Sequence, residues 1–320
     1  MTTDGSKKAF LLALTANVLW ASSFVGSKFT LLSWGPYTSV FLRFALSFLV
    51  LLVFYSAVGI KITIPKSRKQ LSAIVALGLI LGALYSLQLS GLLYISTGFS
   101  ASIMLLAPLI LVIFAPLIAS ERTEHQKIIA IVIGIMGGLI LLSSKLSLTS
   151  EAPLGVWLTL GAAVCLAIFT LLSRRFSIIL DHPTLTLYSF VVGAVAIAPF
   201  ALFEAPIAQM ASEFSKSLIA LFYLVIACTA IPFFIWNRAT SMTEAKNLAS
   251  TMHAKTPAAI ILGVVFFNET ITWTLVLGTV IVTFALWLSQ AKNIFKQKIE
   301  KGNLNHEREP IGSAVFQKIN

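Results

Sequence analysis

The amino-acid sequence predicts an all-α integral membrane protein with ten transmembrane helices arranged as two inverted five-helix repeats. Three observations lead to this fold class: the composition, the number of long apolar runs and a repeated pattern of landmark residues. Of the 320 residues, 58% are hydrophobic and 11% are charged, and the mean hydropathy is +0.92. A soluble domain carries about 25% charged residues. The composition therefore excludes an ordinary soluble protein.

Ten apolar runs are long enough to cross a bilayer, which takes about 20 helical residues. They cover residues 9–33, 36–59, 70–93, 98–119, 126–143, 153–173, 184–203, 217–237, 248–267 and 272–289. The connections between them are short, so no soluble catalytic domain fits between two runs. Lys7 and Lys8 precede the first run as in a signal peptide, but the run is too long for one and we expect a retained helix.

The distribution of Lys and Arg predicts the orientation in the membrane. With the N-terminus in the cytoplasm, the outer side receives only Lys145 and Lys216, and Lys28, Arg43 and Lys255 fall within runs. All the other basic residues lie on the cytoplasmic side, as the positive-inside rule requires. We therefore expect a multi-pass protein of the cell (inner or plasma) membrane with both termini cytoplasmic. The net charge of +11 then indicates contact with anionic lipid of the bilayer rather than with nucleic acid.

An internal repeat is visible in the fourth and ninth runs. The segments LLAPLILVIFAPLIASE and AKTPAAIILGVVFFNE both place a proline before an apolar stretch that ends at a glutamate. These landmarks are Pro108 with Glu121 and Pro257 with Glu269. Because each copy holds an odd number of runs, the second copy enters the membrane upside down. Inverted repeats are the architecture of many secondary transporters, with the substrate site between the halves.

Several segments together resemble a known family. The segments NVLWASSFVGSKFTL, FLRF, GLLYISTGFSASIMLLAPLI and FIWNRATSMTEAKNLAS are similar to those of the drug/metabolite transporter superfamily, specifically its EamA-type permeases. The resemblance implies a ten-helix bundle with a central cavity that moves amino acids, other metabolites or drugs, most often outward and without ATP. The expected organisation is a cytoplasmic N-terminus (1–8), two EamA-type five-helix repeats (9–143 and 153–289) and a cytoplasmic polar tail (290–320).

Cations inside the apolar runs are the first candidates for substrate binding. A charged side chain at mid-bilayer costs about 3 kcal/mol, so it normally faces a wet cavity or a partner. No Asp or Glu lies in the middle of a run. We therefore expect Lys255 and Arg43 to bind an anionic group of a small-molecule substrate, with His253 nearby. Alternatively, Lys255 reaches the headgroups or a carbonyl freed by Pro257, and His253 is an ordinary core residue.

Polar and aromatic pairs three residues apart complete the candidate substrate site. Asn17 and Trp20 share one helix face, as do Tyr85 and Gln88. Such convergent polar groups among apolar walls are typical of ligand sites. Tyrosines and tryptophans in membrane helices also serve as packing or interfacial residues, so a structural role for Trp20 and Tyr85 is an alternative to substrate binding.

Two further expectations concern motion and the third intramembrane cation. The repeat-matched Pro108 and Pro257 are expected to act as helix hinges, because proline disrupts a helix and alternating access requires bending. Lys28 lies in the outer half of its run, and we expect it to reach the outer interface.

The sequence favours one function and leaves others open. We expect a secondary-active permease, first of all an exporter of amino acids or of drugs and other metabolites. The alternative is an importer or exchanger of an anionic metabolite that is nucleotide-like, phosphorylated or carboxylated. A remote alternative is an intramembrane serine hydrolase built on Ser100 and His253.

The sequence also bears on energy sources and cofactors. No phosphate-binding loop or metal-ligand motif is present, so we expect no cofactor, no metal and no ATP-driven step. The substrate, the direction, the coupling ion and the oligomeric state, a monomer included, stay open.

Overall fold

The computed structural model is all-helical over the residues that it describes, which are 3–111, 113, 125–143, 152–204, 210–242 and 249–306. No strand occurs among them. A helix pairs its own backbone N–H and C=O groups, which a segment surrounded by hydrocarbon requires. Six helices are long and apolar enough to cross a membrane, and four shorter apolar helices lie in the other four predicted runs. The predicted helical membrane fold is therefore confirmed.

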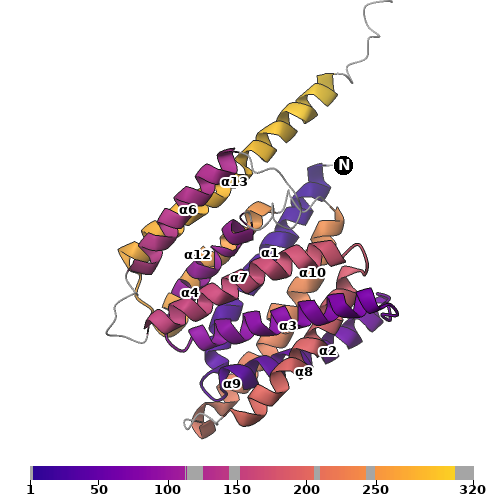
Figure 1. Cartoon of the computed structure of the whole chain (residues 1–320), viewed down its shortest axis with the longest axis vertical. Helices are drawn as coiled ribbons and strands as arrows, with labels where there is room; N and C mark the ends of the chain where they lie inside the picture. The colour runs from indigo at the N-terminus through magenta and orange to yellow at the C-terminus, as the bar shows by residue number, and fades with distance from the viewer. Residues whose placement is uncertain are drawn as a thin grey trace, which may run out of the picture.

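The elements follow one another along the chain with short connections. They are α1 (Thr3–Thr30), α2 (Pro36–Val58), α3 (Arg68–Gly91), α4 (Thr97–Met104), α6 (His125–Ser143), α7 (Ala152–Phe176), α8 (His182–Phe203), α9 (Met210–Val225), the π-helix η1 (Ile226–Ala230), α10 (Ile231–Met242), the 3₁₀-helix η2 (Ala249–Ala254), α12 (Lys255–Phe267) and α13 (Trp273–His306). The last helix continues past the bundle (Figure 1), so the first part of the expected polar tail is helical.

The tightest helix pairs join the first half of the chain to the second. At one edge of the bundle α6 packs along α13 (Figure 1), and α2 packs against α8. Likewise α3 packs against α7 and α8, α4 against α12, and α1 against α9, α10 and α12. Neither half could therefore bury its apolar faces without the other.

Two of the predicted runs are broken helices, and the repeat-matched prolines lie at the breaks. Helix α4 ends at Met104, and helical backbone resumes at Ala107, so Pro108 falls in the first turn of the second piece. In the other run η2 gives way to α12 at Lys255, and Pro257 again falls in a first turn. Proline is tolerated there because the first amides of a helix have no intrahelical acceptor.

A third irregularity is the π-turn between α9 and α10. Pro232 follows it, has no N–H to donate and clashes with a preceding carbonyl in a regular helix. The chain widens instead, and the amide of Ile231 donates to the carbonyl of Ile226, five residues back. This wider turn sets the positions of Cys228 and Thr229, which are both buried.

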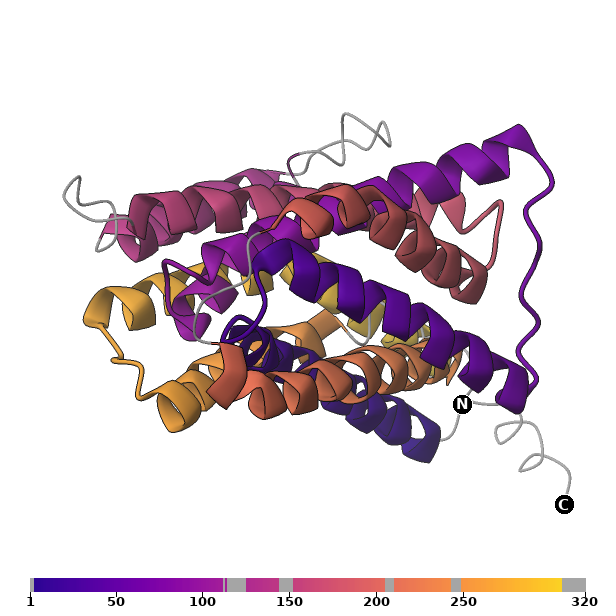
Figure 2. The same cartoon turned by 90° about the horizontal axis from the view of Figure 1, so that it is seen from below.

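A carboxylate begins α8 and fixes the connection between α2 and α3. Asp181 accepts from the amide of Thr184 at 2.8 Å, and its other oxygen accepts from the hydroxyl of Thr63 at 3.1 Å. Figure 2 shows residues 59–67 running in an extended path across this end of the bundle. Asp181 therefore holds that path against the start of α8.

A second carboxylate holds the start of α2. Glu204 follows α8 and accepts from the amides of Tyr37 at 3.1 Å and Thr38 at 2.7 Å. A carboxylate is favoured at this position because a helix N-terminus carries a partial positive charge. Gly35 leaves the space: a Cβ atom built on it would collide with the Glu204 carboxylate.

We expect Gly35→Ala to lower the melting temperature of the purified protein. The backbone of Gly35 (φ −67°, ψ 169°) suits alanine, so the loss would come from displacing Glu204, at about 1 to 3 kcal/mol for unsatisfied amides. The matched control is Gly138→Ala, whose Cβ would make only ordinary contacts with Leu106. Equal melting temperatures for the two variants would contradict the role given to Glu204.

Candidate functional site

Lys255 is the first residue of α12, at the break in the ninth run. Its Nζ lies over the ring of Trp20, 4.5 Å from the centroid. In the described part of the chain no carboxylate lies within ion-pair distance of it. A cation–π contact contributes about 0.5 to 2 kcal/mol, less than the cost of about 3 kcal/mol for a charge at mid-bilayer. The contact orients Lys255 but leaves it without a counter-charge.

Asn17 lies about one helical turn before Trp20, on the same side of α1. The side chain is fully buried and donates from Nδ2 to the carbonyl of Ala13 and to Oγ1 of Thr251, both at 2.9 Å. Its Oδ1 is buried without a hydrogen-bond partner among the described residues. The structure therefore brings together the predicted residues Asn17, Trp20 and Lys255 where α1 crosses η2 and α12.

His253 lies on η2, two residues before Lys255, and its buried Nδ1 has no hydrogen-bond partner in the described structure. The same holds for the hydroxyl of Ser100, so the two do not form the nucleophile–base pair that a serine hydrolase needs. The amides of Thr97 and Gly98 beside Ser100 are already bound to a carboxylate. The geometry gives no support to the hydrolase alternative.

Arg43 forms a second centre on α2. Its side chain is only 2% exposed, Nη2 donates to Oγ1 of Thr229 at 3.3 Å, and the guanidinium lies over the ring of Tyr85 at 4.7 Å. Nη1 is buried without a hydrogen-bond partner among the described residues. An unsatisfied buried donor of this kind costs about 1 to 3 kcal/mol. The predicted residues Arg43 and Tyr85 thus meet, whereas Gln88 is buried without a described contact to either of them.

A chain of packed rings connects these two centres. Trp20 contacts Phe233, and Phe233 contacts Phe190, at centroid distances of 5.6 and 6.1 Å. Phe190 contacts Phe44, which in turn contacts Tyr85, at 5.1 and 5.3 Å. The rings come from α1, α10, α8, α2 and α3. The environments of Lys255 and Arg43 therefore belong to one packed core.

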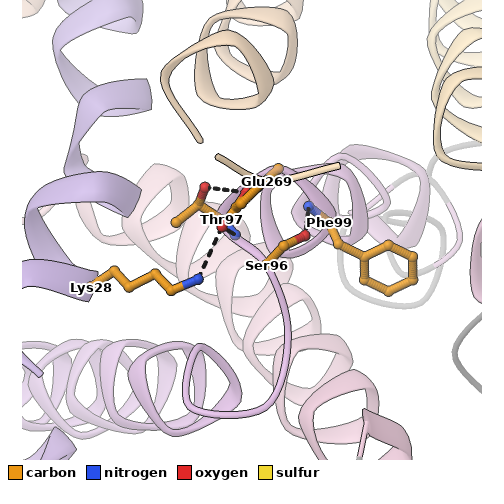
Figure 3. A network of polar contacts seen from close by, with 6 residues as sticks. Lys28, Ser96, Thr97, Phe99 and Glu269 are labelled. Carbon is orange, nitrogen blue, oxygen red and sulfur yellow. Dashed lines mark hydrogen bonds and ion pairs between the residues drawn. The ribbon is translucent and has the colours of Figure 1, made fainter. Parts of the chain in front are cut away.

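Lys28 has a partner that the sequence analysis missed. Its Nζ donates to Oε1 of Glu269 at 3.0 Å, and Glu269 also accepts from the amides of Thr97 at 2.7 Å and Gly98 at 3.1 Å (Figure 3). The hydroxyl of Thr97 donates to Oε2 at 2.7 Å. The expectation that Lys28 reaches the outer interface stays a prediction, and the structure adds that a carboxylate from the loop after α12 lies within its reach.

The loop after α12 is shaped to bring Glu269 to the first amides of α4. Asn268 adopts a left-handed conformation (φ 49°) and ends α12. Its amide donates to the carbonyl of Val264, and the amide of Glu269 donates to the carbonyl of Gly263. This is a common way to reverse a chain at a helix C-terminus. A Cβ atom built on Gly263 would collide with both Thr97 and Glu269. The repeat had marked Glu269 as a landmark, whereas its counterpart Glu121 lies outside the described residues.

The hydrogen bonds also set the protonation of Glu269. Burial alone would raise the pKa of its carboxyl, but the donors from Thr97, Gly98 and Lys28 lower the pKa below the ordinary 4.5. The carboxylate is therefore charged at neutral pH. It joins α1, α4 and the loop after α12 at one end of the bundle.

The surface hollows do not coincide with these centres. One, of about 310 Å³, is lined by Tyr37, Pro199, Phe200, Phe203 and Glu204. Another, of about 440 Å³, is lined by residues 62–64 with Lys66 and Gln70. Both lie at ends of the bundle. The described residues contain no cluster of His, Cys, Asp or Glu able to hold a metal ion.

Long apolar helices packed around buried polar side chains define a multi-pass membrane transport protein. The chain belongs to the EamA-like transporter family, whose profile matches residues 7–143 and again residues 153–290. A relative from Archaeoglobus fulgidus, called an uncharacterized transporter, is 28% identical over 90% of this chain and 98% of its own length.

Two further comparisons span most of the chain. A Salmonella typhimurium relative, called a probable amino-acid metabolite efflux pump, is 24% identical over 92% of this chain and 98% of its own. A solved crystal structure aligns with a TM-score of 0.61 at 19% identity, over 88% of this chain and 96% of that one. This last likeness concerns the fold alone.

We expect Glu269→Gln to destabilise the protein by about 2 kcal/mol, since it leaves Lys28 and two helix amides facing a neutral group. The control is Glu213→Gln, which breaks the pair between the partly buried Glu213 and the exposed Lys216 and should change stability by at most about 1 kcal/mol. Thermal unfolding of the purified variants measures both. Equal shifts would contradict the account.

The same measurement has a pH dependence. Because the folded-state pKa of Glu269 is lowered, its contribution to stability is present above pH 4.5 and is lost as the pH falls through that lower pKa. The difference in melting temperature between wild type and Glu269→Gln should therefore be constant at neutral pH and shrink below pH 4.5. A difference that grows in acid would have the wrong sign.

Proposed function

We propose that the protein is a secondary-active permease of the cell membrane that exports amino acids, drugs or similar small metabolites by alternating access. Membership of the EamA-like transporter family and the uniform naming of relatives as transporters support it. The Salmonella relative, named as a probable amino-acid metabolite efflux pump, favours amino-acid-like cargo and outward transport. The observation that carries the proposal is Lys255, a cation at a helix break that has an aromatic contact but no carboxylate partner among the described residues.

The proposed architecture is ten spans in two inverted five-helix repeats. A two-fold axis in the membrane plane would place related helices of the two repeats against each other. The pairs α2 with α8, α4 with α12 and α6 with α13 fit this rule. The pair α1 with α10 likewise corresponds to α7 with α3. The two family matches cover one proposed repeat each.

The proposed mechanism uses the broken helices. Lys255 lies within three residues of Pro257, and Pro108 occupies the corresponding break in α4's run, so bending there would move the substrate site. The Lys28–Glu269–Thr97 contacts tie three elements at one end of the bundle. Alternating access would require these contacts to separate when that end opens. A substrate gradient or exchange, rather than ATP, would supply the energy.

One observation also favours the second candidate function, import or exchange of an anionic metabolite. Arg43 and Lys255 are both intramembrane cations without a carboxylate partner in the described structure. A substrate that carries negative charge would supply what the protein lacks. This candidate shares the fold and the site with the first, and differs in cargo and direction.

Purified protein in liposomes should move radiolabelled compounds without ATP. Lys255→Gln should reduce the transport of carboxylated compounds at least about tenfold, because a hydrogen bond to a charged group contributes about 1.5 to 3 kcal/mol. The panel contains amino acids, organic acids, sugar phosphates, nucleotides and cationic drugs. Efflux from loaded liposomes and exchange against internal substrate separate the two candidate functions.

The control is Lys216→Gln, which removes an exposed lysine and should leave transport unchanged. Normal transport of every substrate by Lys255→Gln would refute the role of Lys255 while leaving the transporter function intact. Failure of wild type to move any compound would count against the permease itself.

We expect both termini to be cytoplasmic, so that Trp273 lies outside and Ile64 inside. Both side chains are exposed, at 79% and 69%. In a background with Cys165→Ala and Cys228→Ala, a membrane-impermeant maleimide should label Trp273→Cys in intact cells. It should label Ile64→Cys only after permeabilisation. The reverse pattern would show that the membrane orientation is inverted.

A further inference from the structure

Arg43 is a buried cation with one hydrogen-bonded nitrogen, Nη2, and one buried nitrogen, Nη1, that has no hydrogen-bond partner among the described residues. Tyr85 covers a face of the guanidinium, and Oγ1 of Thr229 accepts from Nη2. Among the described residues, Nη1 has no hydrogen-bond partner, and no carboxylate lies within ion-pair distance. Because arginine stays charged even when buried, the side chain cannot relieve this situation by losing a proton.

Thr229 orients Arg43 but cannot neutralise it. Its hydroxyl hydrogen is directed to the carbonyl of Leu224 at 2.8 Å, five residues back, so only lone pairs face the guanidinium. The π-turn at 226–230 provides this geometry, and Pro232 explains why the turn exists. Single π-turns inside α-helices are frequent at functional sites. The π-turn therefore places Thr229 where its hydroxyl oxygen accepts from Arg43.

The arrangement matches a carboxylate. A guanidinium presents planar, parallel N–H donors that fit the two oxygens of a carboxylate. One positive charge among apolar rings and hydroxyl groups balances one negative charge. A phosphate dianion would need further cations, and Lys255 and Lys28 have separate contacts with Trp20 and with Glu269.

We propose that Arg43 is a second substrate-binding residue, whose free Nη1 takes the carboxylate of the transported metabolite in addition to the binding at Lys255. This inference rests on the proposed function, because the buried Arg43 would have to become accessible to a substrate during alternating access.

The depths of the two cations fit successive binding. At 1.5 Å per residue, Arg43 lies about 10 Å from the Glu269 end of the bundle along α2, and Lys255 lies about 18 Å from it along α12.

The test compares carboxylates with analogues in which the same skeleton ends in a hydroxymethyl group. The pairs are L-leucine with L-leucinol, L-phenylalanine with L-phenylalaninol, and 3-phenylpropionate with 3-phenylpropanol. Dissociation constants are measured by calorimetry on purified wild type and variants. The readout is the ratio of the two constants within a pair, which a merely structural change would not move selectively.

Wild type should prefer at least one carboxylate to its alcohol, and Arg43→Gln should reduce that preference by about 10-fold to 100-fold, as expected for a charged hydrogen bond. Arg43→Lys should keep part of the preference. The matched control, Arg175→Gln, removes an exposed arginine and should keep all of it. If Arg43→Gln does not fold, Thr229→Val tests the same point, since the misplaced guanidinium should also lose preference.

Each remaining outcome is decisive. An unchanged preference in Arg43→Gln, or in folded Thr229→Val, would show that Nη1 binds only water and would overturn the proposal. Binding of no carboxylate in the panel by wild type would overturn it as well. Because transport in liposomes is measured separately, a wild type that moves substrates but shows no carboxylate preference refutes this inference and leaves the permease standing.

Discussion

The cost of an uncompensated charge in hydrocarbon is the constraint on which this structure depends. Water is absent at mid-bilayer, so each backbone polar group and each charge must find a partner within the protein or its cargo. The helical fold pairs most backbone N–H and C=O groups. At the N-termini of α2 and α8, the carboxylates of Glu204 and Asp181 accept from backbone amides that have no partner within the helix. The three intramembrane cations differ in whether a described residue of the protein supplies a partner for their charge.

Lys28 is neutralised within the protein, whereas Lys255 and Arg43 have no carboxylate partner in the part of the chain that the structure describes. Glu269 contacts Lys28 and the start of α4 at once, so this cation is part of the contacts that join three elements at one end of the bundle. Among the described residues, Lys255 contacts the ring of Trp20, and Arg43 contacts the ring of Tyr85 and the hydroxyl of Thr229. Stability alone would favour replacing both by apolar residues. We propose that a ligand brings the missing negative charge.

The sequence predicted the helical membrane fold well, because apolar runs and charge placement are local properties. It also paired Asn17 with Trp20 on one face. It could not show that this face meets Thr251, 234 positions away, since long-range contacts leave no local signal. Glu269 was recognisable as a repeat landmark, but its hydrogen bonds depend on the left-handed Asn268. Pro232, a proline inside an apolar run, indicates a helix irregularity near it, which is the π-turn that places Thr229.

The most direct test of the account is an experimental structure of the protein in a lipid nanodisc, saturated with a carboxylate that it transports. The account predicts a carboxylate oxygen within about 3 Å of Nζ of Lys255 or Nη1 of Arg43, the distance of a charge-assisted hydrogen bond. A carboxylate held elsewhere, with both cations solvated by ordered water alone, would contradict the claim that these charges are present for the substrate.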